Sequence, residues 1–210
     1  MTKTKRTLLY ALLLVGIADA TVSVAQTPPV AKLPTRWTKT AMESALPFPE
    51  YPRPQLQRDN WLCLNGKWDY IGGKQVLSSL NPAKPISFNG KSEKILVPYC
   101  PESVISGIQR DLEINMWYQR TFEIPSSWNS KDVVLHFDAV DHDATIFVNG
   151  QKAGSHAGGY DAFSLNITAF LKKGANTLTV AAHDPNDGRT PSGKNGPRGD
   201  YTFTSGIWQT

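Results

Sequence analysis

The chain has 210 residues, of which 40% are hydrophobic, 10% aromatic and 19% charged. These values suit one globular domain, or one domain with tails, and the 16 glycines and 15 prolines favour short strands over long helices. The formal net charge of +4 comes without a dense basic patch, so a nucleic-acid partner is not expected.

Residues 1–25 have the three-part pattern of a secretory signal peptide. Lys3, Lys5 and Arg6 precede an uncharged apolar run from Leu8 to Ala18, and small residues follow it. The alternative is a membrane anchor, but the run is well short of the roughly 20 residues that cross a bilayer. We therefore expect a secreted or periplasmic protein, and no later segment is apolar for long enough to form a transmembrane helix.

Residues 26–55 form a proline-rich leader, which we expect to be extended and irregular because proline lacks an amide donor and fixes φ. Its last part is expected to lie along the surface of the domain. The domain itself is predicted to begin near Leu56 and to cover residues 56–210.

Alternating polarity predicts short strands throughout this domain. An Asn149-Gly150 pair predicts a tight hairpin, because both turn positions need φ > 0. Helical signals are confined to residues 167–172, where Thr168 is a candidate cap. The fold predicted is all-β, a β-sandwich or jelly roll, with a long polar loop at 186–199. The predicted strands cover residues 67–70, 94–97, 116–124, 133–137, 145–148, 151–156 and 176–182.

Residues that could carry chemistry are few. Cys63 and Cys100 could pair after export, but two cysteines do not prove a disulfide, and they are too few for a metal cage. His142 lies between two aspartates and His183 precedes Asp184. Adjacent strand residues point to opposite faces, so we expect hydrogen-bonding roles there and no metal site.

No catalytic pair is expected among the glutamates, which we interpret as solvated surface carboxylates. They are Glu43, Glu50, Glu93, Glu102, Glu113 and Glu123. Nucleophile-elbow and phosphate-loop motifs are absent. The tryptophans considered for stacking on sugars, with core burial as the more ordinary role, are Trp61, Trp68, Trp117, Trp128 and Trp208.

From about residue 52 to residue 210 the chain resembles the N-terminal sugar-binding domain of glycoside hydrolase family 2, the β-galactosidase and β-glucuronidase type. The resemblance rests on the order and spacing of six strings: 61–70 (WLCLNGKWDY), 97–103 (VPYCPES), 117–122 (WYQRTF), 148–150 (VNG), 158–163 (GGYDAF) and 204–208 (TSGIW). It implies a jelly-roll domain followed, in the longer enzyme, by an immunoglobulin-like domain and a TIM barrel.

The resemblance also implies that the barrel carries both glutamates of a retaining mechanism, and that the acid/base follows an asparagine. No Glu follows an Asn here, so no catalytic residue is carried over to this chain. Asp200 matches the position of an Asp that, in β-galactosidases of this family, helps to form a sugar and sodium site. It is the single substrate-binding residue that the resemblance implies.

No cofactor is expected in this chain, and a monovalent or divalent cation is an expectation for the longer enzyme alone. Residues 207–210 have the pattern of the middle of a strand, so we expect a truncated chain of a longer glycosidase. A natural short product is the alternative. It would be a stand-alone carbohydrate-binding or surface interaction module without catalysis. The sequence does not identify the sugar.

Overall fold

The structure is a computed structural model, and it describes residues 35–50, 58–73, 82–110, 113–185 and 202–210. The predicted signal peptide at 1–25 and the candidate residue Asp200 lie outside the described residues. Among the described helices, none combines the length and apolarity that crossing a bilayer requires.

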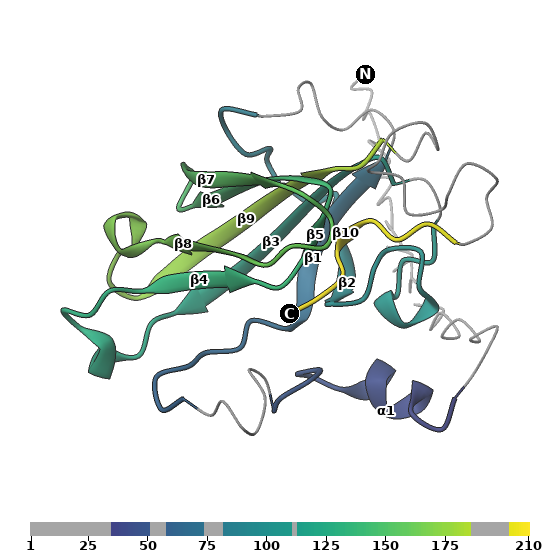
Figure 1. The fold of residues 1–210 in the computed structure, drawn as a ribbon, viewed down its shortest axis with the longest axis horizontal. Helices are drawn as coiled ribbons and strands as arrows, with labels where there is room; N and C mark the ends of the chain where they lie inside the picture. The colour runs from purple at the N-terminus through teal and green to yellow at the C-terminus, as the bar shows by residue number, and fades with distance from the viewer. Residues whose placement is uncertain (1–34, 51–57, 74–81, 111–112, 186–201) are drawn as a thin grey trace, which may run out of the picture.

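The fold is a β-sandwich whose larger layer is a six-stranded antiparallel sheet (Figure 1). Its strand order is β2-β1-β3-β9-β6-β7. The strands are β1 (Gly66–Gly73), β2 (Glu93–Val97), β3 (Asn115–Glu123), β6 (Asp143–Val148), β7 (Gln151–Ala157) and β9 (Ala175–His183).

The facing layer consists of two short antiparallel pairs. One pair joins β4 (Val134–Phe137) to β8 (Phe163–Asn166), and the other joins β5 (Val140–Asp141) to β10 (Gly206–Ile207). The predicted all-β sandwich is therefore confirmed. Alternation placed the longer strands correctly, whereas β5 and β8 were not predicted because two to four residues are too few to show a period. β10 coincides with the strand pattern noted near residues 207–210.

The Asn149-Gly150 turn was predicted correctly, and its side chain explains why the hairpin fits this sheet. Both residues have positive φ, 52° and 80°. The Asn149 Nδ2 group donates to the Phe170 carbonyl at 2.8 Å, and its Oδ1 accepts from the Thr177 amide at 3.0 Å. The turn is thereby fixed to the start of β9.

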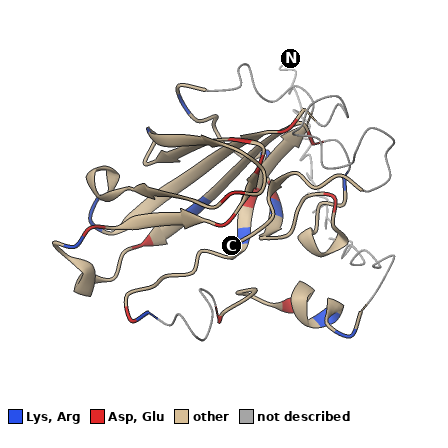
Figure 2. Ribbon diagram, in the orientation of Figure 1, with Lys and Arg blue, Asp and Glu red and all other residues tan. Residues whose placement is uncertain are grey.

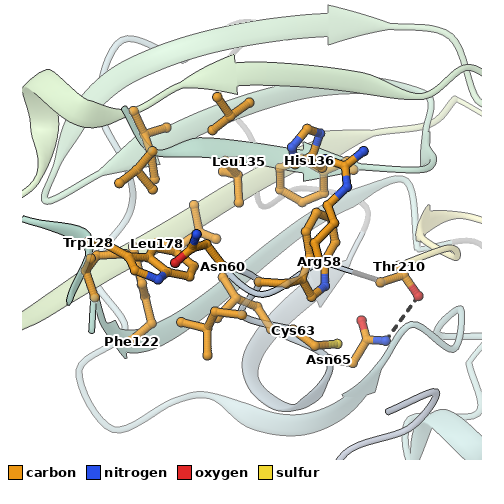
Figure 3. A pocket seen from close by; sticks show the side chains of 18 of the residues that line it. Arg58, Asn60, Cys63, Asn65, Phe122, Trp128, Leu135, His136, Leu178 and Thr210 are labelled. Carbon is orange, nitrogen blue, oxygen red and sulfur yellow. Dashed lines mark hydrogen bonds between the residues drawn. The ribbon is translucent and has the colours of Figure 1, made fainter. Parts of the chain in front are cut away.

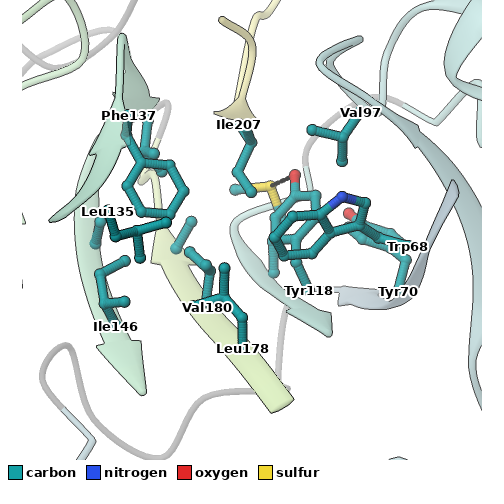
Figure 4. Packing of buried hydrophobic residues seen from close by; sticks show 14 of the residues in the cluster. Trp68, Tyr70, Val97, Tyr118, Leu135, Phe137, Ile146, Leu178, Val180 and Ile207 are labelled. Atoms are coloured by element: carbon teal, nitrogen blue, oxygen red, sulfur yellow. Dashed lines mark hydrogen bonds between the residues drawn. The ribbon is translucent and has the colours of Figure 1, made fainter. Parts of the chain in front are cut away.

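The main core lies between the two layers. In Figure 4, Leu135, Phe137 and Ile146 face Trp68, Tyr70 and Tyr118 across a space that Ile207, Val180 and Leu178 occupy. Burying large apolar side chains contributes about 1.5–3 kcal/mol each, so this contact dominates the stability of the domain. Charged residues of both signs are interspersed along the described chain, strands included (Figure 2).

A second cluster covers the outer face of the six-stranded sheet. It consists of Trp117, Phe147 and Ala181, and Ile71, Ile86 and Phe88 pack against it. The sheet is therefore buried on both faces at its centre. This explains why β6 is buried at nearly every position instead of alternating between buried and exposed.

The leader differs from the prediction. Residues Thr38–Glu43 form the helix α1, where extended chain was expected. The proline-free stretch between Pro34 and Pro47 contains good helix formers, and Thr38 Oγ1 accepts from the Thr35 amide at 2.8 Å.

Pro47 and Phe48 of the leader lie against the domain, whereas the end of the leader, residues 51–55, lies outside the described residues. The Asn65 Nδ2 group donates to the Pro47 carbonyl at 3.1 Å, and the Phe48 ring lies 6.0 Å from the Tyr99 ring.

The predicted helical turn near residue 168 is a 3-10 turn, Thr168–Phe170. Thr168 does not cap it, because its hydroxyl accepts from the Val133 amide instead. Two further 3-10 turns are η2 (Val104–Ser106) and η3 (Ser126–Trp128).

Candidate functional site

The segment that contains Asp200 is fixed in the core of the domain at both of its ends. On one side, Asp184 is fully buried and its amide donates to the Ile114 carbonyl at 2.8 Å. On the other side, Ser205 is fully buried immediately before β10. Asp200 itself is outside the described residues, so the structure places the chain on either side of it but not its carboxylate.

Glu102 holds the Ser205 end. The Ser205 hydroxyl donates to Glu102 Oε1 at 2.7 Å, and the Ser205 amide donates to Glu102 Oε2 at 3.3 Å. Burial raises the pKa of Glu102, and the donors from Ser205 oppose that rise because they stabilise the ionised form. The interpretation of Glu102 as a solvated surface carboxylate is wrong, because the β10 segment covers it.

The same interpretation is wrong for Glu113, which is only 4% exposed. The Tyr70 hydroxyl donates to Glu113 Oε2 at 3.0 Å, and Arg110 Nε donates to Oε1 at 2.7 Å. Arg110 also binds Glu93 through its NH1 group. Burial raises the pKa of Tyr70, so the phenol stays protonated and donates its hydrogen bond. The partly exposed Arg110 guanidinium and the Tyr70 hydroxyl together explain how the buried Glu113 carboxylate is accommodated.

Protein donors engage both of these carboxylates, and the donors tie separate segments of chain together. The two glutamates act as anchors for the loops at this end of the sandwich. Sequence spacing carried no signal for this, because Glu102 and Ser205 are far apart in the chain.

His142, Asp143 and His183 lie together where β6 and β9 pair. The His142 amide donates to the His183 carbonyl at 3.3 Å, and His142 Nδ1 is 3.4 Å from Asp143 Oδ1. His183 Nδ1 is 2.7 Å from Asn115 Oδ1, and burial lowers the pKa of His183. Among the described residues, no group of three or more His, Cys, Asp or Glu side chains is arranged to hold a metal ion.

A cavity of about 280 Å³ lies between the layers, beside β4 (Figure 3). It is lined mainly by apolar groups, and its walls include Trp61, Trp128 and Leu135. The Trp61 and His136 rings stack with 5.4 Å between their centroids, and the Arg58 guanidinium lies over the Trp61 ring, 5.7 Å from its centroid. Sequence reasoning missed the cavity, since segments that are distant in the chain form its walls.

Cys63 also lines this cavity, and the structure answers the question of the disulfide. Cys63 and Cys100 are both free thiols. Burial raises the pKa of Cys63, and it raises the pKa of Cys100 to about 12. Neither thiol is therefore an activated nucleophile.

The tryptophans divide between core and surface. Trp68 and Trp117 are buried in the core, as ordinary strand aromatics are. Trp208 is half-buried and its Nε1 donates to the Gly159 carbonyl at 2.8 Å. The Tyr160 ring stands edge-on to it at 5.9 Å and is 67% exposed, which presents an aromatic surface that sequence reasoning did not single out.

Comparison with known proteins gives a consistent result. Residues 85–210 match the profile of the family described as "Glycosyl hydrolases family 2, sugar binding domain". A putative beta-glucuronidase of Formosa agariphila is 38% identical over 92 residues, which are 43% of this chain and 11% of that protein. A beta-galactosidase of Thermoanaerobacter pseudethanolicus is 29% identical over 151 residues, which are 70% of this chain and 20% of that protein.

The likeness extends to solved structures. The crystal structure of a Bacteroides uniformis beta-glucuronidase superposes with a TM-score of 0.51 at 29% identity, covering 69% of this chain and 16% of that chain. The chain thus spans at most about a fifth of the length of these relatives.

Proposed function

Because the chain belongs to the sugar binding domain family of the family 2 glycosyl hydrolases, we propose that it is the N-terminal, non-catalytic part of a secreted retaining glycoside hydrolase. In this proposal the sandwich braces a catalytic barrel, follows an export signal at residues 1–25 and acts before an immunoglobulin-like domain. The substrate is an O-glycoside, consistent with relatives named as glucuronidases and galactosidases. Export would deliver the enzyme to the periplasm or the medium.

The observation that carries the proposal is the anchoring of the segment around Asp200. Asp184 and Ser205 fix this segment on both sides, and the Glu102 carboxylate holds Ser205 through two hydrogen bonds. A loop whose two ends are held rigidly can place one polar side chain reproducibly at a sugar pocket that this domain and the catalytic barrel form together. We infer that Asp200 contacts the sugar on the non-catalytic side of that pocket.

Catalysis is assigned to residues outside this chain, so the first experiment compares the 210-residue chain with the longer native protein. The 210-residue chain should not hydrolyse aryl β-glucuronides or β-galactosides. An antibody against residues 56–210 should detect a native protein several times larger than 23.2 kDa, and that protein should hydrolyse one of these substrates. Turnover by the purified 210-residue chain would overturn the assignment.

The role of Asp200 is tested in the longer enzyme. Asp200→Ala should lower kcat/KM by about five- to thirtyfold, because a lost hydrogen bond to substrate costs about 1–2 kcal/mol. Asp59→Ala is the matched control, since Asp59 is an exposed carboxylate on the described surface, and it should leave kcat/KM unchanged. Equal kinetics for both variants would remove Asp200 from the site.

One observation favours the alternative of a stand-alone carbohydrate-binding module. Tyr160 and Trp208 form a partly exposed aromatic surface of the kind on which sugar rings stack. If this is the function, the isolated chain should bind glycans on an array, and Tyr160→Ala should abolish binding. Trp37→Ala is the control, because Trp37 is 62% exposed but lies in the leader.

A further inference from the structure

The dipeptide Asn-Gly occurs three times in this chain, at residues 65–66, 89–90 and 149–150. It carries a chemistry of its own besides its preference for turns. The backbone nitrogen of the glycine can attack the side-chain carbonyl carbon of the preceding asparagine, because glycine has no Cβ to obstruct the approach. In a folded protein this attack depends on how firmly the asparagine side chain and the glycine backbone are held, and the three sites differ in that respect.

Asn65 is held by burial. It is only 3% exposed, and its Nδ2 group donates to the Pro47 carbonyl at 3.1 Å. The backbone of Gly66 is equally confined, since it begins β1 and a Cβ placed there would lie 2.6 Å from the Ala45 carbonyl oxygen. The Asn65 side chain therefore cannot turn toward the Gly66 nitrogen without losing its hydrogen bond and displacing its neighbours.

Asn149 is half-buried and is held by hydrogen bonds. Its Nδ2 group donates to the Phe170 carbonyl and to Asn176 Oδ1, both at 2.8 Å, and its Oδ1 accepts from the Thr177 amide at 3.0 Å. Both ends of the side-chain amide are thus fixed, and the nitrogen that would have to leave as ammonia is bonded twice. The Gly150 backbone is exposed, but the Asn149 side chain is not free to meet it.

Asn89 has neither constraint. Asn89 and Gly90 are both exposed, in the turn that leads from residues 82–88 into β2. A Cβ placed at Gly90 would meet no atom within 4 Å. Within the described part of the chain, neither the Asn89 side chain nor the Gly90 backbone amide is hydrogen-bonded. The two reacting groups are therefore free to approach each other at this site.

We propose that Asn89 is a modification site, at which the folded chain converts its own asparagine to aspartate and isoaspartate. The Gly90 nitrogen loses its proton to solvent and bonds to Asn89 Cγ, and the Cγ–Nδ2 bond breaks as Nδ2 takes up a proton and leaves as ammonia. Water then opens the cyclic imide. Opening at Cγ leaves aspartate, whereas opening at the backbone carbonyl leaves isoaspartate, whose backbone is longer by a methylene group. Water is the only co-reactant, and the proposal does not depend on the proposed glycosidase function.

The contacts on either side of the turn decide which product disturbs the fold. Phe88 packs against the outer-face cluster, and Ser92 Oγ donates to Asp69 Oδ1 at 3.1 Å, so both ends of the turn are fixed. Aspartate keeps the backbone spacing and adds a negative charge to an exposed turn beside Lys91, which costs little. Isoaspartate lengthens the backbone between the fixed ends, so it must displace the Phe88 ring or the start of β2.

The test follows all three sites by peptide mass spectrometry during incubation at pH 8, in the native state and in urea. A cooperative urea transition establishes beforehand that the chain is folded. In the native state Asn89 should be converted at least about tenfold faster than Asn65 or Asn149, because those two side chains must first break hydrogen bonds. In urea the fold no longer protects any site, so the three rates should become similar.

Asn89→Gln is the matched variant, because glutamine keeps the side-chain amide but has to close a larger ring. It should remove the acidic form that ion-exchange chromatography separates from the incubated chain, and it should leave the urea midpoint unchanged. Asn89→Asp reproduces the aspartate product and should unfold like the original chain. The isoaspartate form should unfold at a lower urea concentration.

Equal native rates at the three sites would overturn the proposal, and so would conversion of native Asn89 as slow as that of Asn65. A chain without a cooperative transition would overturn it as well, since the protection of Asn65 and Asn149 requires the fold. An acidic form that persists in Asn89→Gln would place the modification elsewhere in the chain.

Discussion

Replacing Ser205 by alanine isolates one hydrogen bond to a covered carboxylate. Ser205→Ala removes the hydroxyl that donates to Glu102 Oε1 at 2.7 Å and leaves the weaker amide bond at 3.3 Å. Hydrogen bonds to charged groups contribute about 1.5–3 kcal/mol, and Ser205 is fully buried, so water does not replace the donor. We expect the free energy of unfolding to fall by about 2 kcal/mol at neutral pH.

The loss should depend on pH with a definite sign. Burial raises the pKa of Glu102 in the folded state, so the folded form favours the proton, and the stability from this group is lost as pH rises through that pKa. Ser205 donates to the ionised form and lowers the pKa. Without it the pKa rises further, so the deficit of Ser205→Ala is largest above the pKa and shrinks as Glu102 becomes protonated.

Urea unfolding between pH 4 and 8, with the transition midpoint and m-value fitted at each pH, measures this deficit. Ser92→Ala is the matched control, because its hydroxyl donates to Asp69 Oδ1 at 3.1 Å on a carboxylate that remains about one-third exposed. We expect a loss of about 0.5 kcal/mol there. A deficit for Ser205→Ala that equals the control, or that does not change with pH, would refute the reasoning.

Three further outcomes are expected. Gly206→Ala should destabilise the fold by about 2 kcal/mol more than Gly90→Ala in thermal unfolding. Both glycines have φ of 70°, so the backbone strain of an alanine is the same at the two positions. The difference comes from space, because a Cβ at Gly206 overlaps the Tyr118 hydroxyl whereas Gly90 faces open space. Phe147→Ala should cost about 3–5 kcal/mol in urea unfolding, since Phe147 is fully buried in the outer-face cluster; a loss under 1 kcal/mol would contradict that burial. The Cys100 thiol, with its pKa raised to about 12, should not react with a maleimide probe at pH 8 until urea is added, and rapid labelling of the native chain would contradict its protection.

The part of this fold that sequence predicts well is the part with a local cause. β3 and β9 are nine residues each, long enough for a strand pattern to show, and the Asn149-Gly150 turn requires positive φ at both positions. The resemblance then supplied the family, because the six strings span most of the domain in order. Each of these features depends on residues that are close together in the chain, so the sequence alone can predict it.

The remainder depends on contacts between distant segments. Glu102 looks like a turn carboxylate beside Pro101, and only the approach of Ser205 removes it from water. α1 forms where prolines on either side suggested extended chain. The cavity has no sequence signature, because Trp61, Trp128 and Leu135 come from three segments that meet only in the sandwich. Asp200 remains a prediction from resemblance.

The exposed edges of this sandwich differ in how they discourage self-association. The six-stranded sheet ends at β2, where Glu93 and Lys94 are exposed, and at β7, where Gln151 and Lys152 are exposed. Charged edge residues oppose pairing with another copy. β4, by contrast, pairs with β8 alone among the described residues and carries no Lys, Arg, Asp or Glu, so its other edge lacks this protection.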